Sequence, residues 1–171
     1  MTSKPILEVE KLNVRYQTQD GEIHAVADVS FKVFSNEVFG IAGESGCGKS
    51  TLIKAIMRLL PENAKMDAHS IKYKDQEIDC MSENIFRKDV LWTQISLVPQ
   101  SAMNSLNPVY KVGEQIVEAI QTHTSQGKKE ARERVEELFD VVGLQSEFMD
   151  SFPHEFSGGM RQRAMIAMAL A

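Results

Sequence analysis

The sequence predicts an α/β fold, and three features of the chain favour it. Two segments with alternating apolar residues come first, and a short apolar run followed by glycines and an amphipathic segment comes next. The second half of the chain has the apolar spacing of helices. With 171 residues, 43% of them hydrophobic and 25% charged, the chain has the length and composition of one ordinary folded domain. A disordered, collagen-like or low-complexity chain is excluded.

The N-terminal region predicts an antiparallel hairpin. Residues 6–16 and 25–33 both alternate between apolar and polar side chains, as half-buried strands do. Asp20 and Gly21 lie between them and form a turn signal. We therefore expect two long strands that pair with each other.

A strand, a loop and a helix are expected next. The apolar run Val38–Ala42 predicts a buried strand, and a glycine-rich stretch follows it. Apolar residues then recur at helical spacing from Lys49 to Leu60, before Pro61. Two more strands are predicted at 71–73 and 95–98, with a short helix around 82–88 between them.

The second half predicts a helical insertion over residues 104–156. One amphipathic helix is marked by Val112 to Ile120, and another by Ala131 to Val142. Charged residues at i,i+4 spacing on the second helix indicate a solvated face. Residues 161–171 predict a last helix. The expected division is residues 1–103 for the β region and nucleotide core, 104–156 for the helical subdomain and 157–171 for the last motif and its helix.

Charge and cysteine content exclude several functional classes. The chain has 19 Lys and Arg against 24 Asp and Glu, a net charge of -5 that argues against a nucleic-acid partner. Its two cysteines, Cys47 and Cys80, form no metal-binding pattern and favour a reducing cytoplasm. No signal peptide and no apolar run of about 18 residues occurs. A membrane role is therefore expected to depend on a partner protein.

A phosphate-binding loop is the strongest chemical signal. Residues 43–51 fill the pattern GxxxxGK[ST] between the expected strand and helix, and they read as follows: Gly43, Glu44, Ser45, Gly46, Cys47, Gly48, Lys49, Ser50, Thr51. Glycines let successive N–H groups point at phosphate oxygens, and the helix N-terminus adds partial positive charge. We expect Lys49 to reach the β- and γ-phosphates of a nucleotide, Ser50 to bind Mg²⁺, and Thr51 to contact an α-phosphate or start the helix.

Cys47 occupies a free position of that loop. The simplest interpretation is a small tolerated residue. As a hypothesis, alkylation of Cys47 blocks entry of the nucleotide.

A second motif, Ser157–Gln162, also places a hydroxyl and glycines at the start of a helix, and it reads Ser157, Gly158, Gly159, Met160, Arg161, Gln162. Together with the upstream loop and the helical insertion, it resembles the signature sequence of the ATP-binding subunits of ABC transporters. Met160 stands where many members have Gln. The resemblance implies the ABC type of P-loop core, with ATP and Mg²⁺ as ligands.

The resemblance also implies roles for two residues outside these motifs. Gln100 resembles the glutamine that contacts Mg²⁺ near the attacking water, so it joins Ser50 as a metal ligand and Lys49 as a catalytic residue. Tyr16 matches the aromatic residue on which adenine stacks, and the alternative is a core residue of the hairpin. His154 and Glu155 are expected in a surface turn.

Three finer stretches resemble the dipeptide, oligopeptide and nickel importer group. They are residues 25–31, 105–108 and 152–156. The resemblance implies a head-to-tail dimer with a second ATP-binding subunit, in which Ser157–Gln162 of one subunit meets the nucleotide of the other. It also implies membrane subunits, an extracytoplasmic solute-binding protein acting indirectly, and a place at the cytoplasmic face of the membrane. The implied activity is ATP hydrolysis coupled to import of peptides or similar solutes.

The resemblance also implies motifs that this sequence does not contain. In the resembled family, an apolar strand ending in Asp-Glu and then a histidine follow the signature, and neither occurs before residue 171. We therefore expect a fragment without the C-terminal part of the core, marginally stable, that binds nucleotide but hydrolyses it poorly. Two alternatives to an importer subunit remain open. One is a soluble ATPase of the same type that acts on DNA or ribosomes, and the other is a nucleotide-binding module that does not hydrolyse ATP.

Overall fold

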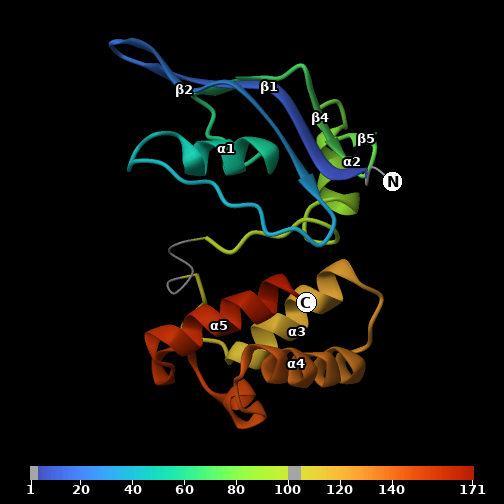
Figure 1. Cartoon of the computed structure of the whole chain (residues 1–171). Coiled ribbons are helices and arrows are strands. Elements are labelled where there is room, and N and C mark those ends of the chain that lie inside the picture. The colour runs from blue at the N-terminus through green and yellow to red at the C-terminus, as the bar shows by residue number, and fades with distance from the viewer. Residues whose placement is uncertain (1–3, 100–104) are drawn as a thin grey trace. The chain divides into compact units, whose positions relative to one another are not determined.

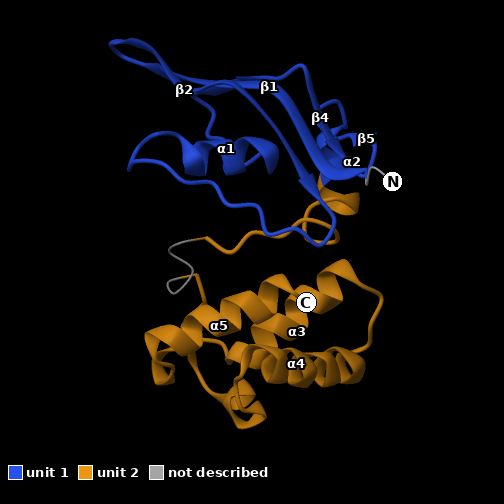
Figure 2. Ribbon diagram, viewed as in Figure 1, with its two compact units in different colours: residues 1–86 blue, residues 87–171 orange. Residues whose placement is uncertain are grey.

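The structure is a computed structural model that describes residues 4–99 and 105–171. Its elements fall into two compact units, residues 1–86 and 87–171 (Figure 2). The functional division expected at residues 103 and 156 stays a prediction.

The first unit is built on a long antiparallel hairpin (Figure 1). Strand β1 (Pro5–Thr18) pairs with strand β2 (Gly21–Phe34). Each strand has 14 residues, so the hairpin that the alternation predicts is confirmed and is longer than expected.

Three short strands complete the sheet. Strands β3 (Ala64–Asp67) and β4 (Ser70–Tyr73) both pair with β1, and β5 (Gln76–Glu77) pairs with β4. The strand order is β2-β1-β4-β5, with β3 on β1, and every pairing is antiparallel. The strand expected at 71–73 is thus confirmed, whereas β3 and β5 were not anticipated.

Helix α1 (Lys49–Ile56) lies against β1 and β2. It is four residues shorter than the 49–60 that the apolar spacing predicts. Arg58 takes a left-handed backbone conformation with φ 54°, and its guanidinium donates to the carbonyl oxygens of Met81, at 2.8 Å, and Ile78. These bonds stabilise a turn at Arg58, so the helix ends before Pro61. The short helix expected around 82–88 is confirmed as α2 (Glu83–Asp89).

The strands predicted at 38–42 and 95–98 are not formed, which corrects two expectations. A strand needs a neighbour that binds its backbone groups, and within the described ranges no strand pairs with residues 38–42. Val38 is fully exposed, and Phe39 stacks on the Phe31 ring with centroids 5.1 Å apart. Ile95 makes an isolated bridge with Leu91.

The second unit is helical. It holds α3 (Val112–His123), α4 (Lys128–Val142) and α5 (Gly158–Ala169), with short 3-10 turns η2 (Ser146–Asp150) and η3 (Pro153–Glu155) between the last two helices. This confirms the three helices that the sequence predicts and places His154 and Glu155 in an exposed turn. The buried core comes from all three helices and their connections, and its largest fully buried side chains are Phe139, Ile116, Ile120, Leu138 and Met149.

A glycine lets α3 approach η2 closely. A Cβ atom on Gly113 would lie 2.8 Å from the carbonyl oxygen of Met149 and 2.9 Å from its Cβ. Backbone atoms cannot move aside as side chains do, so only glycine fits here.

No helix within the described ranges has the length and apolar character needed to cross a bilayer.

Asp150 ties three segments of the helical unit together. Its carboxylate accepts a bond of 2.8 Å from Arg132 on α4 and lies 3.4 Å from the ammonium group of Lys111, just before α3. The hydrogen bond from Arg132 is the main cause that lowers the pKa of Asp150 below its usual value, and Lys111 lowers it further. A carboxyl group with a lowered pKa stabilises the folded state while it is ionised.

We expect the Asp150→Asn variant to test this contribution. At pH 7 the variant should unfold about 1–3 °C below the parent, a small effect because the carboxylate is about half exposed and screened by water. The stabilisation is present above the ordinary aspartate pKa of about 4 and is lost as pH falls through the lower folded-state pKa. Thermal unfolding at pH 7 and at pH 3 measures the difference, which should shrink in acid. A difference that stays the same in acid would contradict the assignment.

Candidate functional site

The glycine-rich loop leads directly into α1. Residues 43–48 form a loop without strand or helix structure, and Gly48 is the N-cap of the helix, with a left-handed φ of 99°. No side chain caps this helix and no acidic residue lies in its first turn. The first N–H groups of α1 are therefore open to an anion, as a helix N-terminus allows.

Lys49 folds back over the loop. Its ammonium group donates to the carbonyl oxygens of Gly43, at 2.8 Å, and Glu44, at 2.6 Å. The Cys47 sulfur lies 3.6 Å from the same nitrogen. The loop thus holds the positive charge of Lys49 at its centre. An arriving phosphate group could replace the neutral carbonyl oxygens that accept hydrogen bonds from Lys49 with charged phosphate oxygens.

Gly48 fixes the loop against the hairpin. A Cβ atom at this position would overlap the carbonyl oxygen of Ala25 and would lie 3.6 Å from Val26 Cγ2. The positive φ of Gly48 is also strained for any other residue. The loop therefore rests on β2 through backbone atoms of both segments.

A cavity of about 460 Å³ opens between β2, the loop and the start of α1. Its size is within the range of small-molecule sites. Its walls are formed by these residues: His24, Ala25, Val26, Ala27, Val29, Ile41, Ala42, Cys47, Gly48, Lys49 and Leu52. The cavity wall is largely apolar on one side, and the loop with Lys49 forms the other side. This arrangement suits a ligand with an anionic end and a less polar body.

Tyr16 lies over the first turn of α1. Its hydroxyl shares a hydrogen bond of 3.4 Å with Thr51 Oγ1, and its strand neighbours are Ile23 on β2 and Ala64 on β3. This places the predicted adenine-stacking residue next to the predicted phosphate loop. The hydrogen bond also gives the Thr51 hydroxyl a partner within the protein. Thr51 lies in the first turn of α1, as the sequence predicts.

Ser50 fits a metal ligand near a bound phosphate. It is exposed in the first turn of α1, directly after Lys49. A hydroxyl oxygen is the kind of donor that Mg²⁺ accepts together with phosphate oxygens and water. Gln100, the second expected ligand, lies outside the described residues.

The Ser157–Gln162 motif forms a second helix start. Ser157 caps α5 by accepting a bond of 3.3 Å from the Met160 N–H. Gly159 has open space around it, and Gln162 is exposed. The two motifs lie in different units.

Sequence reasoning missed most of the cavity wall. Ala25 and Ala27 belong to the stretch 25–31 that resembles the importer group, but this resemblance gave them no place in the site. The wall includes them because β2 runs beside the loop. The hairpin register could have placed residue 24 opposite residue 15. It could not have shown which face of the sheet the loop would cover.

The two cysteines differ in their surroundings. Cys47 is exposed, and its sulfur lies 2.7 Å from the position that a Cβ on Gly43 would take, so it packs inside the loop. Cys80 is also exposed, but the neighbouring Asp79 carboxylate raises the pKa of its thiol. Raising that pKa keeps Cys80 protonated and slows its reaction with electrophiles.

We expect Gly48→Ala to damage both the fold and the site. The substitution imposes a strained φ, which costs about 1–3 kcal/mol, and it pushes the loop away from Ala25. Thermal unfolding should shift downwards, and binding of a fluorescent ATP analogue should be lost. Gly40→Ala is the matched control, because its Cβ would meet no atom within 4 Å and its φ is ordinary. Equal behaviour of the two variants would contradict the close approach.

Alkylation of Cys47 should block the loop. A maleimide adduct cannot fit between Gly43 and Lys49, so labelled protein should bind the ATP analogue at least about tenfold more weakly. The measurement uses a Cys80→Ser background, so that only Cys47 reacts. Cys47→Ser in the same background, treated in the same way, should keep its affinity. Normal binding by fully labelled protein would disprove the blockage.

Comparison with known proteins identifies the family. Residues 26–171 match the family model described as ABC transporter. The chain is 41% identical over 168 residues to the dipeptide transport ATP-binding protein DppD of Bacillus subtilis (strain 168), an alignment covering 96% of this chain and 50% of that protein. It is 42% identical over 167 residues to the oligopeptide transport ATP-binding protein OppD of Escherichia coli (strain K12), covering 96% and 49%. The chain thus spans about half the length of these relatives.

Solved structures share the fold. One, described as the dimeric structure of MJ0796, a bacterial ABC transporter cassette, has a TM-score of 0.80 at 24% identity and covers 96% of this chain and 69% of that one. Another, cbiO1 from Clostridium perfringens, described as part of the ABC transporter complex cbiONQ, has a TM-score of 0.73 at 26% identity and covers 98% and 62%. The α/β fold of an ABC ATPase cassette is confirmed. Since the family model matches well over half of the chain, this protein belongs to the ABC transporter family of ATP-binding proteins.

Proposed function

We propose that this chain is the nucleotide-binding part of an importer ATPase that couples ATP hydrolysis to the uptake of peptides. The observation that carries the proposal is the loop that starts α1, with Lys49 at its centre and uncapped N–H groups around it. The peptide cargo rests on the names of the relatives and on the resemblance of residues 25–31, 105–108 and 152–156 to the importer group.

ATP binding would use the loop for the phosphates and Tyr16 for the adenine. Lys49 would leave the carbonyl oxygens of Gly43 and Glu44 and bind the β- and γ-phosphates. The N–H groups of residues 46–51 would surround the phosphate oxygens. The Tyr16 ring would offer the base an aromatic face close to Thr51.

Hydrolysis would depend on positioning and on charge neutralisation. Ser50 and Gln100 would hold Mg²⁺, which supplies positive charge beside the phosphates when bound. Lys49 would neutralise the γ-phosphate as negative charge shifts during transfer to water, and the loop would keep that phosphate in line for attack. The carboxylate that would orient the water is not assigned to any residue of this chain.

A second ATP-binding subunit would complete the site. The start of α5, with Ser157, Gly158 and Gly159, would cover the nucleotide held by the loop of the partner subunit, and Met160, Arg161 and Gln162 would follow in the same contact. Support comes from the exposed glycine and from the N–H groups of the first turn, of which Ser157 occupies that of Met160.

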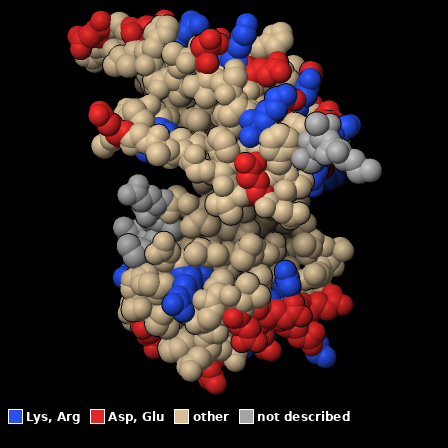
Figure 3. All heavy atoms as spheres, viewed as in Figure 1, with Lys and Arg blue, Asp and Glu red and all other residues tan. Residues whose placement is uncertain are grey.

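The proposed partners are membrane subunits, with a solute-binding protein acting through them, at the cytoplasmic face of the membrane. Nucleic acid is not a proposed partner. Exposed carboxylates gather along α4, and Figure 3 shows acidic side chains over this part of the second unit. The net charge of the whole chain, -5, also disfavours binding to a phosphate backbone. The acidic residues of α4 are Glu130, Glu133, Glu136, Glu137 and Asp140.

We expect Lys49→Ala to remove most nucleotide affinity. Charge-assisted bonds to phosphate contribute about 1.5–3 kcal/mol, so the Kd for a fluorescent ATP analogue should rise about 10- to 100-fold. Lys54→Ala is the matched control, because Lys54 is an exposed lysine of the same helix outside the loop. The control should bind like the parent. Parent-like affinity in Lys49→Ala would refute the site.

A further inference from the structure

Tyr16 carries a hydroxyl group that stacking on a base does not use. Stacking needs only the aromatic ring, which a phenylalanine would also supply. The Tyr16 hydroxyl lies 3.4 Å from Thr51 Oγ1. Within the part of the chain that the structure describes, this is the only side-chain hydrogen bond of either hydroxyl. The Tyr16 hydroxyl is therefore directed at the helix that starts from the loop.

The backbone of Tyr16 is fixed from both sides. Tyr16 pairs with Ile23 on β2 and with Ala64 on β3. The register between β1 and β3 runs without a break from residue 13 to residue 16, so side chains alternate regularly on this part of β1. Val14, two residues before Tyr16, shares its face and is fully buried. The Tyr16 ring thus lies on the inner face of the sheet, which agrees with its bond to Thr51 on α1.

Two hydroxyl groups that share one hydrogen bond leave one proton unused. A phenol is a better donor than an aliphatic alcohol, so Tyr16 is the natural donor and Thr51 Oγ1 the acceptor. Thr51 then keeps its own proton for another acceptor. Thr51 lies in the first turn of α1, two residues after Lys49, where the open N–H groups also lie. Phosphate oxygens are acceptors, so they suit this remaining proton.

The distance of 3.4 Å is long for a bond between two hydroxyl oxygens, whose usual range is about 2.5–3.0 Å. Hydrogen bonds in binding sites often tighten only when the ligand arrives. A phosphate oxygen that accepts the Thr51 proton makes Oγ1 a stronger acceptor, because consecutive hydrogen bonds polarise one another. Ligand binding would therefore strengthen the bond from Tyr16 to Thr51.

We propose that the Tyr16 hydroxyl is a positioning group for the phosphates, which donates to Thr51 Oγ1 and so directs the Thr51 proton at a phosphate oxygen of the nucleotide. The inference rests on the proposed nucleotide site and adds a second role for Tyr16. The ring would serve the base, and the hydroxyl would serve the phosphates through Thr51. Tyr16 itself does not touch the phosphates.

The test uses Tyr16→Phe, which removes the hydroxyl and keeps the ring. Isothermal titration of the full chain measures binding of ATP and of inorganic tripolyphosphate, which has three phosphates but no base. Tyr16→Phe should bind both ligands about 2- to 5-fold more weakly than the parent. Parent-like binding of both would overturn the proposal, because stacking alone would then explain Tyr16. A loss for ATP without a loss for tripolyphosphate would overturn it too, since the hydroxyl would then act on the nucleoside.

Two variants of Thr51 test whether the hydroxyl acts through this residue. Thr51→Val removes Oγ1 and should weaken binding of both ligands about 3- to 10-fold. Thr51→Ser keeps a hydroxyl and should stay within about twofold of the parent. In the Thr51→Val background, Tyr16→Phe should cause no further loss for tripolyphosphate, because both substitutions break the same chain of bonds. Additive losses in the double variant would overturn the proposal.

Tyr110→Phe is the matched control. Tyr110 is an exposed tyrosine of the second unit, so the variant loses the same hydroxyl outside the loop and its helix. It should bind both ligands like the parent. A loss equal to that of Tyr16→Phe would overturn the inference.

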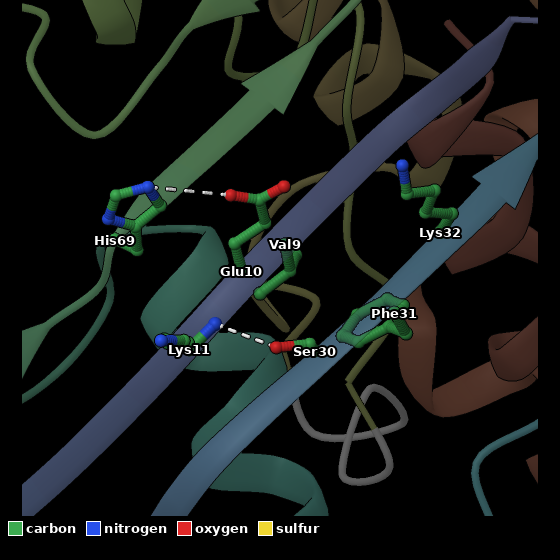
Figure 4. Close-up of a pocket in the computed structure, with 7 residues that line it drawn as sticks. All are labelled: Val9, Glu10, Lys11, Ser30, Phe31, Lys32 and His69. Carbon is green, nitrogen blue, oxygen red and sulfur yellow. Dashed lines mark hydrogen bonds and ion pairs between the residues drawn. The ribbon is translucent and has the colours of Figure 1, made fainter.

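Another hollow of the first unit could attract tripolyphosphate by charge. It lies over β1 and β2, and Lys11 and Lys32 are among its lining residues (Figure 4). Lys11→Gln removes one of these positive charges and should leave both affinities unchanged. A loss of tripolyphosphate affinity as large as that of Tyr16→Phe would place this ligand in the hollow and overturn the inference.

Lys49→Ala separates this inference from the proposed function. The variant should lose affinity for both ATP and tripolyphosphate, because Lys49 acts on the phosphates. If neither ligand binds the parent, or if Lys49→Ala binds like it, the nucleotide site itself is wrong and the inference falls with it. If Lys49→Ala behaves as expected and Tyr16→Phe equals the parent, only the role of the Tyr16 hydroxyl is wrong.

Discussion

The contact between Gly48 and the carbonyl oxygen of Ala25 determines how the first unit is assembled around its site. Both partners are backbone, so their distance cannot be adjusted by a rotamer change. Gly48 is also the N-cap of α1, so the position of that helix follows from the same contact. Loop, helix and hairpin are therefore fixed together, and a cavity remains between them.

A bulge in β2 lies at the place where the strand meets the loop. Val14 pairs with Val26 and the next residue, Arg15, pairs with His24, so Ala25 is an extra residue on β2. Beside the loop, β2 offers a run of small and apolar residues, Ala25, Val26 and Ala27. The bulged residue itself supplies the carbonyl oxygen that requires glycine at position 48.

The sequence allowed prediction of those features that depend on near neighbours. The hairpin, the loop before α1 and the helices α3 to α5 follow from spacings of two to four residues and from turn signals. The runs at 38–42 and 95–98 have apolar composition too, but strand structure requires a partner that local spacing cannot supply. The early end of α1 is similar, since Arg58 bonds to Met81 more than 20 residues away. The bulge at Ala25 left no mark in composition, which is why the extra residue was not predicted.

The two helix starts differ in what they can bind alone. At α1, no side chain occupies the first N–H groups, and Lys49 adds a full positive charge within the loop. At α5, Ser157 occupies one N–H group, and the cation of the motif, Arg161, has its Nε atom buried. An anion therefore gains more at α1, both from open donors and from charge. In the proposed dimer, this asymmetry favours a sequence of events in which nucleotide binds first at the loop, and the start of α5 from the second subunit only adds to a ligand already held.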